Sequence, residues 1–364
     1  RIMVDGEPIA DAAIADAWDE IAPIVALVDD ELEQKDEPPL TFFELLTVLA
    51  FVSFADAPVD VAVIEVGMGG SWDATNTADG DVAVFAPIDI DHADKLGDTI
   101  GEIATVKAGI IKQGAAAVSA AQTPAAASVL ASAARAQGAS LAVEGEQFGL
   151  LDQKLAVGGQ LFPLRGLAAT YEELYLPLYG AHQGHNAALA ITAVESLIGG
   201  GTQPIAADVL ADGLGNVTSP GRLQLVGIAP TVIVDSAHNP HGARALVAAL
   251  GDSFDFDEWG LVLGAFADKD VAGIVGALAP AVAHVFATAP ESDRAEEPDA
   301  VADLVEQTET PVTVHRDLAE AAEAARAWAA ESERRAVVIA GSVVLAGEAV
   351  VLAEAEDWKS GYNS

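Results

Sequence analysis

The sequence predicts an α/β protein built from two doubly wound domains in series. Short apolar runs rich in β-branched residues alternate with helical patterns along most of the chain. These runs are continuous rather than alternating, which is typical of parallel strands covered by helices on both faces. The length of 364 residues provides material for two hydrophobic cores.

The first predicted domain begins with helices and continues in a βαβ rhythm. We expect helices over residues 10–28 and 41–55, and strands over residues 61–66, 82–87 and 115–119. Between residues 148 and 179, short runs alternate around glycines and predict a small antiparallel sheet. A helix over residues 184–198 follows, and the glycine run 199–201 ends it.

The second predicted domain begins after a turn-rich connection at residues 216–222, which contains Pro220-Gly221. We therefore place the domain border between residues 217 and 218, which gives domains of residues 1–217 and 218–364. Strands are expected at residues 231–235, 260–264, 284–288, 311–314 and 336–340, with helical patterns between them. Asp235 would lie at the carboxyl end of the first of these strands.

Two apolar runs of the first domain carry polar groups near their ends. Glu65 lies in the run at 61–66, and His92 follows the run that begins at Val82. Ligands of parallel α/β sheets bind beyond the carboxyl ends of the strands, where both side chains would point. A carboxylate in an apolar strand needs a metal or a cation as compensation. The alternative is a structural ion pair, but the first basic residue that follows Glu65 is Lys95.

A short helix is predicted from Thr99, because Thr99 and Glu102 have the spacing of a capping box. Lys107 then lies in the last turn, and Gly109 is the expected stop. Lys107 and Lys112 could simply complement the helix dipole. Because lysine is scarce in this chain, we interpret the two as functional.

Six ordered motifs together resemble the folylpolyglutamate synthase and dihydrofolate synthase family of the Mur ligase superfamily. Residues 65–76 (EVGMGGSWDATN) resemble the family's second signature, residues 91–92 its "LDH" element, and residues 107–112 (KAGIIK) match its segment unchanged. Residues 182–187 (HQGHNA), 220–223 (PGRL) and 235–240 (DSAHNP) resemble the ATP-contacting helix, the interdomain linker and the "DGAHNP" box, with Ser236 where glycine is usual. The resemblance extends along nearly the whole chain.

The resemblance implies an ATPase-like Mur ligase central domain and a Rossmann-like C-terminal ligase domain. It also implies that a folate or dihydropteroate carboxylate attacks the γ-phosphoryl group of ATP, and that the amine of L-glutamate displaces the resulting acyl phosphate. Such chemistry depends on positioning and charge neutralisation rather than on a protein nucleophile.

Residue roles follow from the same resemblance. Glu65 and His92 would hold Mg²⁺, although nitrogen ligation of this ion is unusual. Lys107 would be carbamylated by CO₂ to an anionic ligand, or would contact a phosphate unmodified.

The remaining roles concern the nucleotide. Asn186, Arg222 and Asp235 would contact ATP, and Arg222 suits a phosphate because its planar fork is permanently charged. The alternative for Arg222 is an ordinary surface arginine. His238 would act in catalysis by orienting the nucleotide, or would merely organise the turn before Pro240.

Three other functions are alternatives for this sequence. An NAD-dependent oxidoreductase would need glycine at the sixth place of G-x-G-x-x-G, where Trp72 stands after Gly67 and Gly69. A non-catalytic paralogue without a P-loop is the stronger rival, although the metal and ATP motifs argue against it. Another Mur-type amide ligase is also possible, and the sequence does not separate dihydrofolate synthase from folylpolyglutamate synthase activity.

The start of the chain resembles a position inside the family's sequences. Residues 1–9 (RIMVDGEPI) are similar to a family segment, "RIRVNGEPI", that follows the P-loop and its helix, and no G-x-x-x-x-G-K-S/T pattern occurs. We therefore expect an incomplete N-terminus. On this expectation the chain alone binds ATP poorly and does not turn over, because the amides that cradle phosphates are missing.

The composition excludes several classes of protein. A net charge of −39, from 56 acidic and 17 basic residues, excludes a nucleic-acid groove as the primary site. We interpret this charge as a surface adapted to high salt. No run is long and apolar enough for a membrane span, and the absence of cysteine excludes disulfides and thiol chemistry. We expect a cytoplasmic monomer with small-molecule substrates.

Overall fold

The computed structural model describes residues 2–90, 93–156 and 158–359. The chain forms two compact units, of which the first comprises residues 1–148 and 192–203 and the second residues 149–191 and 204–364. The α/β class and the doubly wound arrangement predicted for the chain are confirmed. The domain border at residues 217 and 218 stays a prediction.

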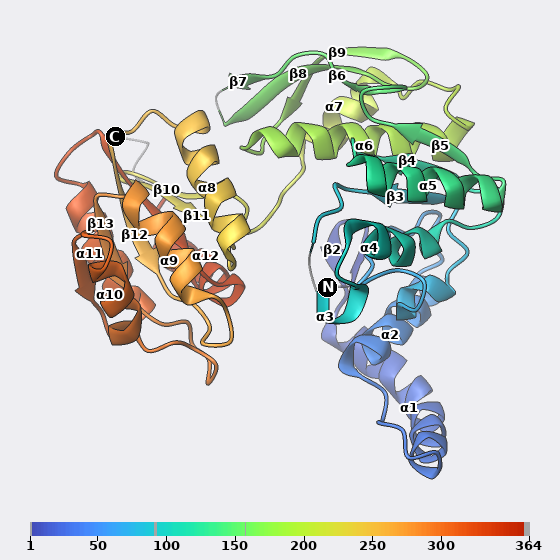
Figure 1. Ribbon diagram of the computed structural model, residues 1–364, viewed down its shortest axis with the longest axis horizontal. Helices are drawn as coiled ribbons and strands as arrows, with labels where there is room; N and C mark the ends of the chain where they lie inside the picture. Colours follow the sequence, from blue (N-terminus) through green and yellow to red (C-terminus); the bar gives the residue numbers. More distant parts are fainter. Residues whose placement is uncertain (1, 91–92, 157, 360–364) are drawn as a thin grey trace. The chain divides into compact units, whose positions relative to one another are not determined.

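The first unit is built on a parallel sheet with strand order β3-β4-β5, which α4 and α5 cover side by side (Figure 1). Ile103 and Ala104 of α4 and Ala126 and Leu130 of α5 are buried in its core. The elements are β1 (Met3–Val4), β2 (Glu7–Pro8), α1 (Asp11–Gln34), α2 (Phe42–Asp56), η1 (Ala74–Thr77), β3 (Val82–Phe85), α3 (Ala93–Leu96), α4 (Ile100–Lys107), η2 (Ala108–Ile110), β4 (Ala116–Ser119), α5 (Pro124–Gln137) and β5 (Ser140–Val143).

The predicted strand at residues 61–66 is wrong. This segment has no regular secondary structure and within the described chain it joins no neighbouring strand, and the side chain of Val63 is 91% exposed. An apolar run gives the preference for burial, whereas a strand also requires a partner that accepts its backbone hydrogen bonds. Glu65 is therefore exposed on an irregular segment and does not lie inside a sheet.

The second unit begins with the small antiparallel sheet that the sequence predicted. Strand β8 pairs with β6, β7 and β9. The helix predicted from residue 184 begins at Ala181, so His182 and Gln183 belong to its first turn. The elements are β6 (Gly149–Leu150), β7 (Lys154–Ala156), β8 (Gly159–Arg165), β9 (Thr170–Leu176), α6 (Ala181–Gly199, the end of which lies in the first unit) and α7 (Ala207–Gly215).

A six-stranded sheet of order β10-β11-β15-β12-β13-β14 forms the rest of this unit, parallel except for the edge strand β10. Helices α8, α9 and α10 pack on one face of this sheet, and helices α11 and α12 pack on the other. The elements are β10 (Gln224–Ile228), β11 (Thr231–Val234), α8 (Pro240–Ser253), β12 (Glu258–Leu263), α9 (Val271–Leu278), η3 (Ala279–Ala281), β13 (His284–Ala287), α10 (Pro298–Glu306), β14 (Val312–Val314), α11 (Leu318–Ala329), β15 (Arg335–Ala340) and α12 (Val343–Ala355).

The five strands predicted for this sheet are confirmed, and β10 was missed. Each central strand sends alternate residues to opposite faces, as Leu261 and Val262 of β12 do, and both faces are apolar because helices cover both. Across the described residues, the helices lack the length and apolar character needed to span a membrane.

Candidate active site

The glycine turn at residues 67–73 is held against the end of α4 by backbone contacts. The Ser71 N–H donates to the Val106 carbonyl at 2.9 Å. A side chain at Gly70 would place its Cβ 2.7 Å from the Val106 oxygen and 2.8 Å from the Lys107 oxygen. Only glycine permits this approach, so the turn fixes the backbone that carries Lys107.

Side-chain hydrogen bonds also join the residues after α4 to the segment that contains this turn. Asn76 Nδ2 donates to the carbonyls of Ser71 and Gly109, each at 3.2 Å. Lys112 Nζ donates to the Asn76 carbonyl at 2.7 Å. The segment 107–112 therefore pairs structurally with the signature at 65–76. Lys112 therefore has a structural role. The sequence analysis interpreted both lysines as functional and did not distinguish Lys112 from Lys107.

Gly109→Ala should destabilise the protein by about 1–3 kcal/mol, because the new Cβ would lie 2.6 Å from Ser71 Cα and overpack the contact between the glycine turn and the segment after α4. Gly101→Ala is the matched control, since Gly101 lies in the same helix region with nothing within 4 Å of a new Cβ. The control should be stabilised by up to about 1 kcal/mol from helix propensity. Urea unfolding of both variants measures the difference. Equal changes in the free energy of unfolding would contradict the close packing of Gly109 against Ser71.

Lys107 lies half-buried in the last turn of α4, whose start has the predicted capping box of Thr99 and Glu102. Across the described residues, neither the Lys107 amine nor the exposed carboxylate of Glu65 makes a hydrogen bond or an ion pair. His92, the other predicted metal ligand, lies outside the described residues.

Among the described residues, one predicted ligand of Mg²⁺ can be assessed, the carboxylate of Glu65. They contain no group of three His, Cys, Asp or Glu side chains that could enclose a metal ion. Mg²⁺ is usually bound by one or two carboxylates together with water and substrate phosphates, so Glu65 fits the role of a single protein ligand.

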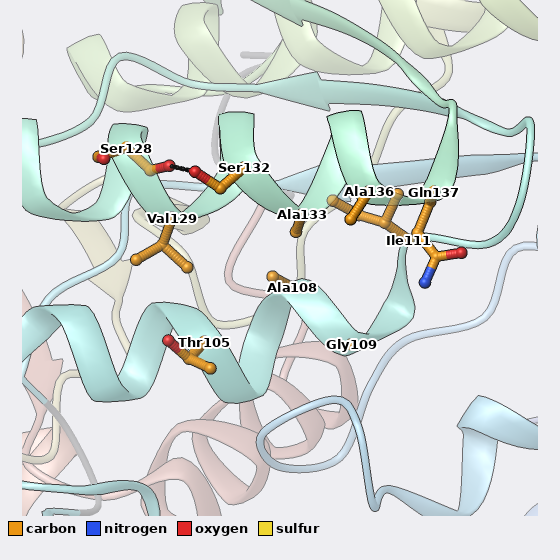
Figure 2. Close-up of a pocket in the computed structure, with 10 residues that line it drawn as sticks. All are labelled: Thr105, Ala108, Gly109, Ile111, Ser128, Val129, Ser132, Ala133, Ala136 and Gln137. Carbon is orange, nitrogen blue, oxygen red and sulfur yellow. Dashed lines mark hydrogen bonds between the residues drawn. The ribbon is translucent and has the colours of Figure 1, made fainter.

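A groove of about 460 Å³ lies between α4 and α5, next to the turn that follows Lys107 (Figure 2). Its walls are made of small and apolar side chains with a few neutral polar groups, such as Thr105, Ser132 and Gln137 (Figure 2). Among the residues that the structure describes, none that lines it is ionisable. The groove therefore lacks the cations that a phosphate would require.

In the second unit, Asp235 follows β11 with its carboxylate tied to the backbone. Its two oxygens accept the N–H groups of Leu223 at 3.0 Å and Ala237 at 2.8 Å. The residue is only 8% exposed, and this burial raises the pKa of the carboxyl above its ordinary value. The two hydrogen bonds and the charges of Arg222 and His182 oppose the rise.

Arg222 and His182 bring two further motifs to this carboxylate. Arg222 is exposed, and within the described chain its guanidinium makes no hydrogen bond or ion pair. The His182 ring lies against Gly180 at the start of α6, where partial burial lowers its pKa and the Asp235 charge opposes that shift. The linker, the α6 terminus and the DSAHNP box therefore meet at Asp235.

His238 is half-buried, with Nδ1 2.9 Å from the Ser236 carbonyl. A carbonyl can only accept, so Nδ1 carries the proton and the neutral ring keeps Nε2 as an acceptor. Asn186 is exposed on α6, and its Nδ2 donates to Gln183 Oε1 at 3.2 Å. From residues 182–187 the sequence analysis predicted Asn186 as a nucleotide contact and missed His182. The predicted helix started at residue 184, whereas the observed helix starts at Ala181 and so includes His182.

The raised pKa of Asp235 predicts a pH effect on folding. A buried acid with a raised pKa contributes stability below its ordinary value of 3.8 and loses it as the pH rises through the folded-state pKa. Relative to the wild type, Asp235→Asn should therefore become progressively more stable between about pH 3 and 7. Chemical unfolding at each pH measures this difference.

Asp317→Asn is the control of opposite sign. The Glu320 N–H bond at the start of α11 lowers the pKa of Asp317, so its carboxylate contributes stability that is present above the ordinary value. This variant should become less stable relative to the wild type as the pH rises. The same slope for both variants would contradict the assignment for Asp235.

Comparisons with known proteins agree with these motifs. Residues 12–194 match the Mur ligase middle domain, and residues 221–343 match the Mur ligase glutamate ligase domain. The dihydrofolate synthase/folylpolyglutamate synthase of Mycobacterium tuberculosis is 44% identical, over 97% of this chain and 77% of that protein.

Two solved structures are similar along nearly the whole chain. The M. tuberculosis folylpolyglutamate synthase complexed with ADP has a TM-score of 0.87 at 43% identity, covering 96% of this chain and 80% of that one. Escherichia coli FolC in complex with DHPP and ADP has a TM-score of 0.79 at 28% identity, covering 98% and 78%. With two domain matches in order and a relative at this identity, the chain belongs to the dihydrofolate synthase/folylpolyglutamate synthase family of Mur ligases.

Proposed function

We propose that the protein ligates L-glutamate to a folate or dihydropteroate carboxylate at the expense of ATP. The observation that supports this best is the meeting of Arg222, His182 and the buried Asp235 in one place, on motifs that resemble the nucleotide contacts of the family. ADP in the M. tuberculosis and E. coli relatives, and DHPP in the latter, supports a nucleotide and a pterin substrate for this chain as well.

The reaction proceeds in two displacements. A substrate carboxylate oxygen attacks the γ-phosphorus and ADP leaves, which gives an acyl phosphate. The glutamate amine then attacks the acyl carbon, phosphate leaves, and the nitrogen loses a proton. Negative charge accumulates on phosphoryl oxygens in both steps, so fixed cations and hydrogen-bond donors are the chain's main contribution.

Residues of the second unit bind the nucleotide in this proposal. The exposed guanidinium of Arg222 takes phosphate oxygens, and Asn186 contributes an exposed amide from α6. Asp235 holds Leu223, the neighbour of Arg222, through the backbone and so orients the arginine. His238 presents Nε2 as an acceptor beside the same box.

Residues of the first unit act on the phosphoryl group. Glu65 and His92 would hold Mg²⁺, which when bound neutralises phosphate charge. Lys107, as its carbamate, would supply a further anionic ligand from the end of α4. The turn at residues 67–73 holds the Lys107 backbone in place through Gly70. We further propose a cytoplasmic monomer.

The test is ATP-dependent incorporation of radiolabelled L-glutamate, measured on the chain as it stands and on the chain extended by a P-loop segment. Dihydropteroate, a reduced folate and a cell-wall muramoyl precursor serve as alternative acceptors. Incorporation into either pterin by the extended form is expected. Incorporation only into the muramoyl precursor, or none with any acceptor in a folded extended protein, would overturn the proposal.

Arg222→Lys separates planar phosphate recognition from simple charge. In the form extended by a P-loop segment, it should raise the KM for ATP at least tenfold, because the forked pair of donors is lost while the charge remains. Arg135→Lys is the matched control, since Arg135 is exposed on α5 and donates to Ser132 of the same helix. Equal KM values for the two variants would remove Arg222 from the site.

A further inference from the structure

Two histidines on neighbouring strands of the C-terminal sheet point to one oxygen atom. His284 Nε2 lies 3.1 Å from Thr313 Oγ1, and His315 Nε2 lies 3.0 Å from the same oxygen. The two nitrogens are therefore no more than about 6 Å apart. None of these residues belongs to the motifs discussed above.

The strand register explains why the three side chains meet. Phe286 of β13 pairs with Thr313 of β14 in a parallel ladder. Residues two apart on a strand share a face, so His284 lies beside Phe286 and His315 beside Thr313 on the same side of the sheet. The ring centroid of Phe286 is 4.5 Å from that of His284 and 5.8 Å from that of His315.

Proton counting shows that, with both rings neutral, the two hydrogen bonds form together only when the rings are different tautomers. The Thr313 hydroxyl has one proton, so it can donate to only one of the two Nε2 atoms when both rings are neutral. The other ring must carry its proton on Nε2 and donate to the hydroxyl oxygen. If the proton of this second ring moves from Nε2 to Nδ1, the Nε2 lone pairs of both rings point into the same space.

We propose that His284 and His315 form a two-imidazole site for a divalent transition metal of the zinc, nickel or copper class. Two nitrogens on one tetrahedral zinc lie roughly 3.3 Å apart for bonds of about 2.0–2.1 Å. Side-chain rotation at two half-buried rings can close that gap. The Thr313 hydroxyl lies next to the metal position, and Phe286 forms an apolar floor.

The ligand chemistry selects the kind of metal. Imidazole suits zinc, nickel and copper, whereas Mg²⁺ requires oxygen ligands. In the described chain no third His, Asp or Glu completes the group, so water or an external ligand fills the remaining positions. The site is therefore expected to be open and exchangeable.

A bound metal would join the edge strand to the body of the sheet. Strand β14 has three residues and lies at the edge of the sheet, paired with β13. A metal held by one residue from β13 and one that follows β14 binds the folded state and not the unfolded chain, and so stabilises the fold by mass action. This property does not depend on the proposed ligase activity.

The experiment uses the whole chain without a polyhistidine tag. Calorimetric titration with Zn²⁺ and Ni²⁺ should show one saturable site, and Mg²⁺ should not compete for it. His284→Gln and His315→Gln should each weaken binding at least tenfold, and each should abolish the rise in melting temperature on adding metal. Electron paramagnetic resonance of the Cu²⁺ form should show two imidazole nitrogens.

His241→Gln is the matched control, because His241 is exposed on α8, and it should leave binding unchanged. His182→Gln tests the second pair of histidines, at positions 182 and 185, and should also leave it unchanged. Binding that persists in His284→Gln and His315→Gln, or that disappears in His182→Gln, would overturn the proposal. Circular dichroism of each variant ensures that loss of binding is not loss of folding.

Discussion

Lys107→Ala should abolish glutamate ligation in a protein that carries this chain together with a P-loop segment. If Lys107 is carbamylated, its removal eliminates an anionic metal ligand that acts in the transition state, and we expect kcat to fall by roughly 10²–10³-fold or more. Short carboxylates such as acetate should restore part of the rate by filling the vacated space. Steady-state kinetics with and without acetate measure both effects.

The arginine variant distinguishes a carbamate from a simple cation. Lys107→Arg keeps a positive charge, but a guanidinium cannot be carbamylated, so the variant should remain inactive. Lys154→Ala is the matched lysine control, because the Lys154 amine lies on the surface in an ion pair with Asp152. Near-normal kcat in Lys107→Arg would show that a cation suffices and would exclude the carbamate.

The second unit was predictable because its strands carry their own signal. Residues 258–263 and 335–340 are almost uniformly apolar, since helices cover both faces of the sheet. Strand β10 was missed because it directly follows the turn-rich connection at residues 216–222 and contains no more than two consecutive apolar residues. The run at residues 61–66 has the apolar signal without a pairing strand in the described chain, so the same rule failed there.

The site was predictable residue by residue but not as an assembly. Asp235 follows from its place at the end of a strand, and the structure adds that two backbone N–H groups hold its carboxylate. The contact between Lys112 and Asn76 joins residues 36 positions apart, and no local pattern reports such a pair. His182 likewise gains its meaning from Asp235, which is distant in sequence.

Raising KCl from dilute buffer to about 1 M should raise the melting temperature steeply, by on the order of 10 °C. With 56 acidic and 17 basic residues the folded surface repels itself, and unfolding relieves that repulsion. Salt shortens the range of this repulsion from roughly 10 Å at 0.1 M to roughly 3 Å at 1 M. Calorimetry over a KCl series measures the effect.

Salt also weakens the attractive pairs, and the charge balance decides which effect is larger. Arg334 contacts both Asp255 and Asp257, but exposed pairs of this kind contribute at most about 1 kcal/mol each. Seventeen basic residues can pair with only a minority of 56 acidic ones, so screened repulsion outweighs screened attraction. Sucrose at matched osmolality is the control, because it favours compact states without screening charge. If screening is the cause, the melting temperature should level off near 1 M KCl, whereas salting-out would make it continue to rise. A melting temperature that does not change with KCl would contradict the high-salt interpretation of this surface.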